Sequence, residues 1–356
     1  MELILVLPTF LVIITFINFF TIRNPSETAE IAESVSVLVP LRNESNNVIA
    51  LVDSLKNQRL LKNVEFIFLD DNSEDLTYQF LEDAVSGLKN FHIIKGSLLP
   101  PGWIGKSWAL HQSLEVARGE IIISVDADVR LKPDAISKSI SLMNSTGLDF
   151  MSPYPRQLAF TVGEKLIQPL LQWSWMSTVL LRIAERTSFS SMAVANGQFF
   201  IARRSALDVA GGYESVKSAV LDDVFLARRL VASGARGVVV NGADIAECRM
   251  YASWNEIEAG YGKSLRFAFG STLGAISVAV FLFLTGIAPL IFIMTNARIG
   301  LLAYLLIVLS RLMSAFKSKG RLSYSFLHPA SSALLIYLIA YSFLMRREIQ
   351  WKGRTL

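Results

Sequence analysis

The sequence predicts an α/β domain with a mainly parallel sheet, flanked at both ends by transmembrane helices. Three observations predict this fold class. Short β-branched runs alternate with amphipathic stretches between residues 35 and 241, long uncharged runs lie near both ends, and 52% of the 356 residues are hydrophobic. A mean hydropathy of +0.43 is too high for an ordinary soluble enzyme, so part of the chain is expected in lipid.

Composition also limits the possible functions. Cys248 is the single cysteine, so the chain cannot form an internal disulfide or a thiolate metal cluster, and we expect a small buried hydrophobe there. The net charge is +4, and the Lys and Arg residues gather beside apolar segments instead of forming a stripe with aromatic residues. This distribution favours acidic lipid headgroups as partners, and no nucleic-acid partner is expected.

The chain begins with an uncharged segment. Residues 3–22 carry no charged side chain and are about as long as a helix needs to cross the hydrocarbon layer. A secretory signal would start with basic residues, whereas here Glu2 comes first and Arg23 is the first cation. We therefore expect residues 1–24 to be a transmembrane anchor that leaves the following residues in the cytoplasm.

A second apolar region spans residues 264–346. It contains the uncharged run 267–297, which Pro289 should kink, then the short run 299–310 and the longer run 322–345. The short run is a crossing only if Arg311 snorkels. Four crossings would put the basic tail, residues 347–356, outside, against the positive-inside rule, so the number of crossings stays open. A multi-pass cell-membrane protein is expected, and nothing in the sequence sets its oligomeric state.

One further apolar stretch lies inside the expected cytoplasmic domain. Residues 166–181 are uncharged but contain Pro169, Trp173 and Trp175. Two tryptophans with flanking cations are typical of a helix that lies in the membrane interface, near residues 158–183, and a buried core helix is the alternative. In the first case, Trp173 and Trp175 would contact a lipid acceptor.

Residues 34–250 form the expected cytoplasmic domain. Its predicted strands are residues 35–39, 64–69, 91–95, 121–125 and 237–240. Its predicted helices are residues 45–58, 75–88, 106–118 and 223–232. In such sheets ligands bind beyond the carboxyl ends of the strands, so the polar residues that end each strand are the candidate site residues.

Those strand ends are acidic. The polar residues after the first, second and fourth strands are Arg42, Asn43, Glu44, Asp70, Asp71, Asp126 and Asp128. Any one Asp after a strand could be only a helix cap or part of an Asx turn. Paired carboxylates at successive strand ends exceed what capping requires, and they favour a functional edge of the sheet.

The Asp126-Ala127-Asp128 unit suggests a metal site. In an extended segment the two carboxylates would point to the same face. Their repulsion would be relieved by a divalent Mg²⁺ or Mn²⁺, which still leaves coordination sites for diphosphate oxygens. A metal so placed would stabilise a departing nucleotide diphosphate.

Two adjacent acids, Asp222 and Asp223, begin the last predicted helix. Favourable interaction with the helix dipole would explain them without any pocket. The alternative is that one of them is a general base that deprotonates an acceptor hydroxyl. Adjacent helix positions diverge by about 100°, so only one of the two is expected to face the site.

Taken together, these segments resemble family 2 glycosyltransferases of the GT-A fold. The resemblance rests on the first-strand segment VSVLVPLRNE (35–44), the acidic turn FLDDNSED (68–75), the Asp-Ala-Asp unit and the acids at 222–223. It implies transfer with inversion at the sugar carbon. By the same resemblance, nucleotide contacts fall to Pro40, Arg42, Glu44, Asp70, Lys106 and Asp126, metal ligation to Asp126 and Asp128, and catalysis to Asp223 with Asp222 beside it.

Four further segments resemble the carotenoid- and hopanoid-associated branch of that family. They are PPGWIGKSWALHQ (100–112), NGQ (196–198), RMY (249–251) and WKGR (351–354). The branch implies a polyene or polycyclic lipid acceptor, with Asn196, Gly197 and Gln198 near the sugar or acceptor. Lys106 begins a predicted helix, where it could reach phosphate or be an ordinary solvated lysine.

The chain departs from the family in several places, one of which is Asp222-Asp223 where relatives carry Glu-Asp. His111 stands where relatives carry Asn, and it could replace the amide hydrogen bonds. The Gln-x-x-Arg-Trp signature of processive synthases is missing, which argues against a long polymer product. The leading hypothesis is transfer from a UDP-sugar to a lipid. The alternatives are a polyprenyl-phosphate glycosyltransferase, a nucleotidyltransferase, or an inactive membrane protein that binds nucleotide sugars.

Overall fold

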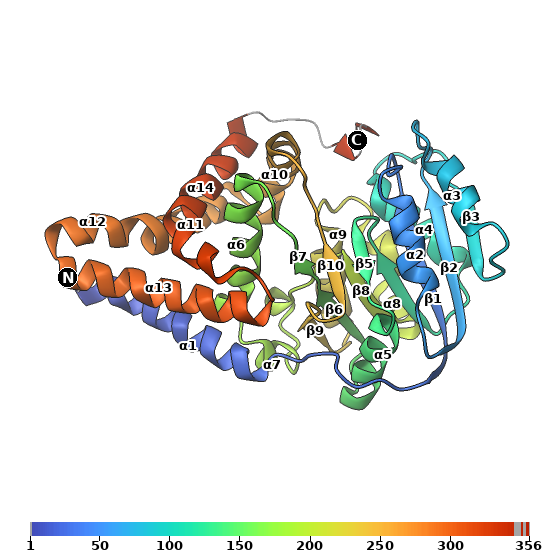
Figure 1. Cartoon of the computed structure of the whole chain (residues 1–356), viewed down its shortest axis with the longest axis horizontal. Helices are drawn as coiled ribbons and strands as arrows, with labels where there is room; N and C mark the ends of the chain where they lie inside the picture. Colours follow the sequence, from blue (N-terminus) through green and yellow to red (C-terminus); the bar gives the residue numbers. More distant parts are fainter. Residues whose placement is uncertain (1, 345–349, 352–353, 356) are drawn as a thin grey trace. The chain divides into compact units, whose positions relative to one another are not determined.

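The computed structural model describes residues 2–344, 350–351 and 354–355. The chain forms two compact units, shown in Figure 1. We call the first the helical unit, which comprises Met1–Ile22, Gln157–Arg182 and Arg249–Ile349. We call the second the sheet unit, which comprises Arg23–Arg156, Ile183–Cys248 and Gln350–Leu356.

The sheet unit is built on a seven-stranded sheet (Figure 1). Its strands, in spatial order, are β3 (Phe91–Lys95), β2 (Leu61–Asp70), β1 (Ile31–Leu41), β4 (Ile121–Val125), β8 (Phe199–Arg203), β6 (Phe150–Tyr154) and β9 (Gly237–Asn241). All neighbours pair in parallel except β8, which is antiparallel to both β4 and β6. The mainly parallel sheet and all five expected strands are confirmed. The pattern missed β6 and β8, and the proline in β6, Pro153, argues against a strand there.

Helices connect these strands. They are α2 (Val48–Lys56), α3 (Thr77–Val85), α4 (Gly105–Val116), α5 (Ala135–Thr146), α8 (Arg204–Ala210) and α9 (Asp222–Ala232). The four expected helices are present. α2 and α3 are shorter than expected at both ends, whereas α4 and α9 each begin one residue earlier. The pattern missed α5, which stops at Gly147 in a left-handed conformation with φ of +63°. Apolar side chains from the sheet and from α4, α8 and α9 form one core around Leu38, Ile122 and Leu230.

A second, small sheet lies beside the main one in the sheet unit. In it, β5 (Val129–Leu131) runs antiparallel to β10 (Ala246–Cys248), and Val129 pairs with Cys248. This pairing brings the single cysteine next to the end of the Asp126-Ala127-Asp128 segment. Cys248 is buried, as the sequence predicts. Of the expected basic tail, the strand pair Gln350–Trp351 and Arg354–Thr355 is described, and residues 347–349, 352–353 and 356 lie outside the described residues.

The helical unit contains α1 (Val6–Thr21), α6 (Val162–Thr178), α10 (Trp254–Ala268), α11 (Thr272–Leu282), α12 (Ala288–Thr295), α13 (Ala297–Lys317) and α14 (His328–Leu344). Four helical stretches among the described residues are long and apolar enough to cross a membrane: Glu2–Thr21, Thr272–Thr295, Ala297–Lys317 and Leu322–Leu344. The second of them contains a π-helical turn, Phe283–Ile287, just before Pro289, which accounts for the expected irregularity.

The third of these helices corrects a prediction. The expected run of residues 299–310 is short, whereas α13 extends over 21 residues because Arg311 lies inside it. Arg311 does not snorkel out of the unit, since its side chain is only 2% exposed. The prediction ended this helix at residue 310 because Arg311 is charged, and that C-terminal end was wrong.

The stretch with two tryptophans also differs from the interfacial prediction. It forms α6, which begins with a capping box between Thr161 and Glu164. Trp173 is fully buried among α1, α13 and α14, and its indole N–H donates to Ser310 Oγ at 2.7 Å. Trp175 is 8% exposed. The structure thus shows the buried core helix, and neither Trp173 nor Trp175 presents the open aromatic face expected of an acceptor contact.

The N-terminal helix is more than an anchor. Thr15 on α1 shares a 2.8 Å hydrogen bond with Ser310, so α1, α6 and α13 meet at one polar point. One turn further, the amide of Asn18 donates to the carbonyls of Met176 and Val179. Such buried polar contacts between apolar helices fix their register, because each group would otherwise be unsatisfied.

A conservative substitution tests this packing. Trp173→Phe removes the indole N–H that binds Ser310, and it leaves a small cavity. We expect the helical unit to lose about 1–3 kcal/mol of stability, seen as a lower thermal unfolding midpoint in detergent. Trp254→Phe, at the partly exposed start of α10, is the matched control and should leave the midpoint nearly unchanged. Equal effects of both substitutions would contradict the assigned role of Trp173.

Candidate active site

The acidic strand ends meet at one edge of the main sheet. Asp70 is the last residue of β2 and pairs in register with Leu41 of β1. Asp126 directly follows β4, which pairs in parallel with the other side of β1. The carboxyl ends of three neighbouring parallel strands therefore present these acids to the same side, as predicted.

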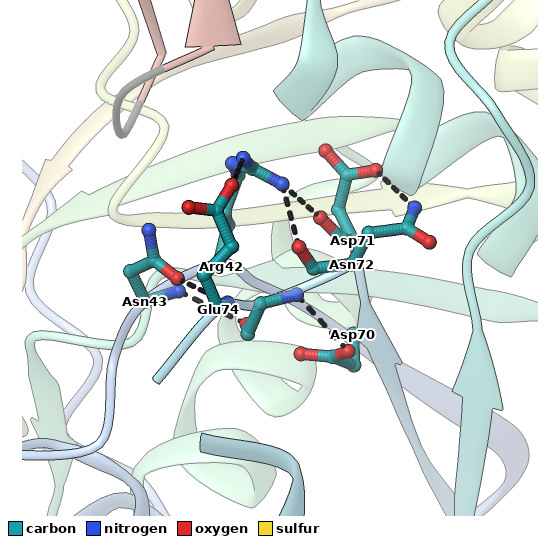
Figure 2. Close-up of polar contacts among 7 residues, drawn as sticks. Arg42, Asn43, Asp70, Asp71, Asn72 and Glu74 are labelled. Atoms are coloured by element: carbon teal, nitrogen blue, oxygen red, sulfur yellow. Dashed lines mark hydrogen bonds and ion pairs between the residues drawn. The ribbon is translucent and has the colours of Figure 1, made fainter. Parts of the chain in front are cut away.

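A guanidinium organises the first of these loops (Figure 2). Arg42 is 4% exposed and donates to the carbonyls of Asp71, at 2.6 Å, and Asn72, at 2.8 Å. It also pairs with Glu74 at 3.0 Å. These donors hold the turn after β2 against the end of β1. Arg42, which was expected to contact the nucleotide, thus uses its guanidinium to hold this turn in place.

Asp70 offers an acceptor in the same place. Its side chain is buried, and Oδ2 accepts the backbone N–H of Ser73 at 3.3 Å. Its other oxygen, Oδ1, is buried and has no hydrogen-bond partner among the described residues. A buried acceptor without a donor is costly, so this oxygen is suited to a hydroxyl of a bound ligand. Pro40 is buried within β1, and as a proline it has no N–H to donate to a neighbouring strand.

The Asp-Ala-Asp segment is a turn, not an extended strand. The N–H of Val129 donates to the carbonyl of Asp126 at 3.1 Å, and Arg130 holds the turn by donating to the carbonyl of Ala127 at 2.7 Å. The same-face argument from strand geometry was therefore wrong. The two carboxylates still interact, because Asp126 raises the pKa of Asp128.

The carboxyl group of Asp128 has a strongly raised pKa. Burial first, then the charges of Asp126 and Glu44, raise its pKa to about 7, while the Cys248 thiol lowers it. Its Oδ1 is buried and lacks a hydrogen-bond partner among the described residues. A buried carboxylate oxygen without a donor, next to a second carboxylate, fits a cation. In the described part of the chain, no three His, Cys, Asp or Glu side chains are placed to hold a metal ion together, so a cation here would need further oxygens from a ligand.

The side chain of Lys106 reaches into this acidic site and pairs with Asp126. It lies in the first turn of α4, and its Nζ is 2.6 Å from Asp126 Oδ1 and donates to Oδ2 at 2.9 Å. Burial lowers its pKa, but the carboxylates of Asp126, Asp222 and Asp223 raise it above its usual value overall. The interpretation as an ordinary solvated lysine is thus wrong. Lys106 forms an ion pair with Asp126 and lies within electrostatic reach of Asp222 and Asp223.

The two acids of α9 differ in their surroundings. Burial raises the pKa of both, and that of Asp222 reaches about 6. Asp223 is fixed in orientation, because Oδ2 accepts the N–H of Gly197 at 2.6 Å and Oδ1 accepts the N–H of Val224 at 2.8 Å. Both acids act on Lys106, so both lie within electrostatic reach of the site, although only one was expected to face it.

The loop of residues 196–198 joins these groups. Asn196 is tied to β6 by the Ser152 hydroxyl at 2.8 Å, and its own Oδ1 accepts the N–H of Gln198 at 2.8 Å. The carbonyl of Gln198 accepts the N–H of Asp126 at 3.0 Å. A Cβ at Gly197 would lie 3.0 Å from Lys106 Nζ. The loop thus connects the acid after β4 with the acid that begins α9.

Family comparison agrees with this geometry. Residues 36–211 match the sequence model of Glycosyl transferase family 2. The chain carries a family 2 glycosyltransferase domain. The chain is 25% identical over 351 residues to a 4,4'-diaponeurosporenoate glycosyltransferase of Staphylococcus haemolyticus, covering 91% of this chain and 89% of that protein. It is 27% identical to a beta-monoglucosyldiacylglycerol synthase of Trichormus variabilis, over 55% of this chain and 41% of that protein.

The fold of this glycosyltransferase is also shared with a solved structure. The mannosyltransferase PcManGT from Pyrobaculum calidifontis, in complex with GDP-Man and Mn²⁺, aligns over 96% of both chains with a TM-score of 0.54 and 16% identity. The predicted GT-A fold, the glycosyltransferase class and the likeness to the carotenoid-associated branch are confirmed.

Sequence patterns missed two neighbours of Asp128 in the glycosyltransferase domain. Arg130 clamps the turn, and Cys248 contacts Asp128 through the pairing of β5 with β10. An arginine two residues after the Asp-Ala-Asp unit was a usable signal, whereas the pairing with β10 was not visible in the sequence. His111 lies against the rings of Trp103 and Trp108, at centroid distances of 4.8 and 5.6 Å, and this placement gives no support to its expected replacement of an amide.

Gly197 allows a direct test of the converging geometry. In Gly197→Ala the new methyl group would lie 3.0 Å from Lys106 Nζ and 3.2 Å from Asp223 Cβ, so at least one of them must move. We expect about a tenfold loss in kcat/KM of the glycosyltransferase, with little change in unfolding temperature. Gly234→Ala, at a position with open space but a φ of +93°, is a control for backbone strain, and it should leave kcat/KM unchanged. Full activity in Gly197→Ala would contradict the close approach.

Proposed function

We propose that this protein is a membrane-integral, inverting glycosyltransferase that moves a sugar from a nucleotide diphosphate, a UDP-sugar, to a lipid acceptor of the carotenoid or hopanoid type. One observation carries the proposal. The ammonium of Lys106 pairs with Asp126 and lies within electrostatic reach of Asp222 and Asp223, at the carboxyl edge of a parallel sheet in a domain of family 2. The likeness to a diaponeurosporenoate glycosyltransferase over nearly the whole chain supports a lipid acceptor.

In this proposal the nucleoside lies along the ends of β1 and β2. Asp70 Oδ1 and Glu44 would accept hydrogen bonds from the base and ribose, next to Pro40. Arg42 keeps the turn of residues 71–74 in the shape that this contact needs. Asn196, Gly197 and Gln198 would line the place of the sugar, since Gly197 contacts Asp223 directly.

A divalent metal, Mg²⁺ or Mn²⁺, would be held by Asp128 and Asp126. When bound, it supplies positive charge to the diphosphate that leaves. Asp128 contributes a buried oxygen without a donor, and the proton it holds near neutral pH is the one that a cation displaces. Lys106 keeps Asp126 charged and adds a second positive charge on the leaving-group side.

Asp223 is the proposed general base. Its two backbone hydrogen bonds fix the carboxylate, and the raised pKa makes it a stronger proton acceptor than an exposed aspartate. The acceptor oxygen forms a bond to the anomeric carbon as the bond from that carbon to the diphosphate breaks, and the acceptor proton passes to Asp223. A carboxylate acceptor has already lost its proton, so it would need no base.

The membrane arrangement is part of the same proposal. Four apolar helices support a multi-pass protein of the cell membrane, with the glycosyltransferase domain on the cytoplasmic side where the charge rule places it. A lipid acceptor would then be drawn from the inner leaflet.

A direct assay tests the proposed function. The full chain, purified in detergent, is incubated with labelled UDP-sugars, Mn²⁺ and a bacterial lipid extract that contains carotenoids. We expect label in an organic-phase product, and none in the presence of a chelator. Label found only in the aqueous phase as free sugar, or no label with any donor although the nucleotide sugar binds, would refute a lipid glycosyltransferase.

A further inference from the structure

The helical unit contains a small polar pocket that the proposed chemistry does not use. It lies between α6, α13 and the 3-10 turn Leu322–Leu327 that precedes α14. The residues that line it with polar groups include Gln172, Arg311, Ser314, Ser318, Tyr324 and Ser325. Such a pocket is unusual beside four helices that are otherwise apolar enough to cross a membrane.

Arg311 gives this pocket its charge. Its side chain is 2% exposed, and Nη1 lies 3.5 Å from Nδ1 of His328. Its other terminal nitrogen, Nη2, is buried and has no hydrogen-bond partner among the described residues. None of the ion pairs described in the structure includes Arg311. A guanidinium stays charged in proteins, and burying it without an anion is strongly unfavourable.

Neutral donors lie in the same pocket. The hydroxyls of Tyr324 and Ser325 are both buried, and neither has a hydrogen-bond partner among the described residues. Arg321, which is exposed, adds a second positive charge to the lining. No acidic side chain is among the described residues that line the pocket. The pocket thus has three donor groups without partners among the described residues, on Arg311, Tyr324 and Ser325, and a second cation, Arg321. With no acid in its described lining, this set of groups favours an anionic ligand.

The surface beside the pocket indicates what carries that anion. The turn Leu322–Leu327, which supplies Tyr324 and Ser325 to the pocket, also carries three exposed apolar side chains, with exposed fractions of 46% for Leu322, 52% for Phe326 and 41% for Leu327. These apolar side chains therefore lie on the same turn as two of the hydroxyls that line the pocket. The pocket itself is small, so it admits the oxygens of a headgroup but not a nucleotide or a sugar ring.

We propose that this pocket binds the anionic headgroup of an amphiphile, a carboxylate or a phosphate, by Arg311 Nη2 and the hydroxyls of Tyr324 and Ser325, while the apolar chain of the amphiphile lies against the exposed apolar side chains of the turn Leu322–Leu327. The site belongs to the helical unit alone. Its test needs no sugar transfer, so its failure is distinguishable from failure of the proposed enzymatic function.

The test measures binding to the full chain in a nonionic detergent, by displacement of a fluorescent fatty acid. Oleate, phosphatidic acid, oleyl alcohol and inorganic phosphate are the competitors. We expect oleate or phosphatidic acid to bind at least about tenfold more tightly than oleyl alcohol, because only they carry the anion. Equal affinity of oleate, phosphatidic acid and oleyl alcohol would overturn the proposal. Inorganic phosphate that competes as well as the lipids would show a free-anion site and overturn the amphiphile assignment.

Variants assign the effect to the pocket. Arg311→Gln should remove the preference for the anion, whereas Arg298→Gln, an exposed arginine at the start of the same helix, should retain it. If Arg311→Gln fails to fold, the double variant Tyr324→Phe/Ser325→Ala keeps the charge and removes the two neutral donors. That variant should weaken binding of the anion by about tenfold, and unchanged affinity in a folded protein would overturn the site.

Discussion

Asp223→Asn should lower kcat for transfer to a hydroxyl acceptor by about 10²–10⁴-fold, with nucleotide-sugar affinity changed by less than about threefold. The substitution keeps the size of the side chain but removes the group that takes the proton. It also places an amide where Oδ2 now accepts the N–H of Gly197. Steady-state kinetics with a fixed donor concentration, and donor binding measured separately, would check both parts.

Two controls separate base catalysis from misplacement of the loop. Asp222→Asn removes the neighbouring acid, whose pKa is about 6, and should have the smaller effect on kcat if Asp223 is the base. A carboxylate acceptor offers the second control, because transfer to it requires no proton removal and should lose much less in Asp223→Asn. Equal loss with hydroxyl and carboxylate acceptors would show that the variant disturbs positioning. A larger loss in Asp222→Asn would move the base to that residue.

Asp128→Asn should abolish the metal dependence of donor binding, weakening Mn²⁺ affinity by at least about 100-fold, and should raise the stability of the metal-free protein at pH 8. Burial raises the pKa of Asp128 to about 7, so the folded state holds a proton that the unfolded chain releases near pH 4. Between those two values the folded state binds more protons, and stability falls as the pH rises. Asn carries no such charge, so it removes a penalty of at most about 4 kcal/mol.

The affinity for Mn²⁺ should also change with pH, in a defined direction. In the unsubstituted protein Mn²⁺ competes with the proton on Asp128, so Mn²⁺ affinity should increase about tenfold from pH 6 to pH 8. Thermal unfolding with and without Mn²⁺, over that range, measures both the affinity and the stability. Asp53→Asn, at an exposed position on α2, is the matched control and should change neither. A pH-independent Mn²⁺ affinity in the unsubstituted protein would contradict the role of Asp128.

The site illustrates how much could be read from local patterns. Strand ends rich in carboxylates were visible because each strand is a short apolar run that stops at an acid, and the parallel sheet then brings Asp70 and Asp126 to one edge. The contact between Lys106 and Asp126 was not visible, since the two residues lie 20 positions apart and no periodicity links them. The turn at residues 126–129 was misjudged because strand geometry was extended past the end of β4.

The sequence by itself determined the α/β class, the apolar segments, the acids at the sheet edge and the family, because these depend on local hydrophobic period and on short motifs. Only the tertiary structure decided that Trp173 packs in a core, that Arg311 is buried beside a pocket, and that Lys106 pairs with Asp126 near the acids of α9. The physical reason is that burial and charge pairing are set by residues distant in the chain. An apolar tryptophan or an isolated arginine has the same local pattern at a membrane surface as in a packed interior.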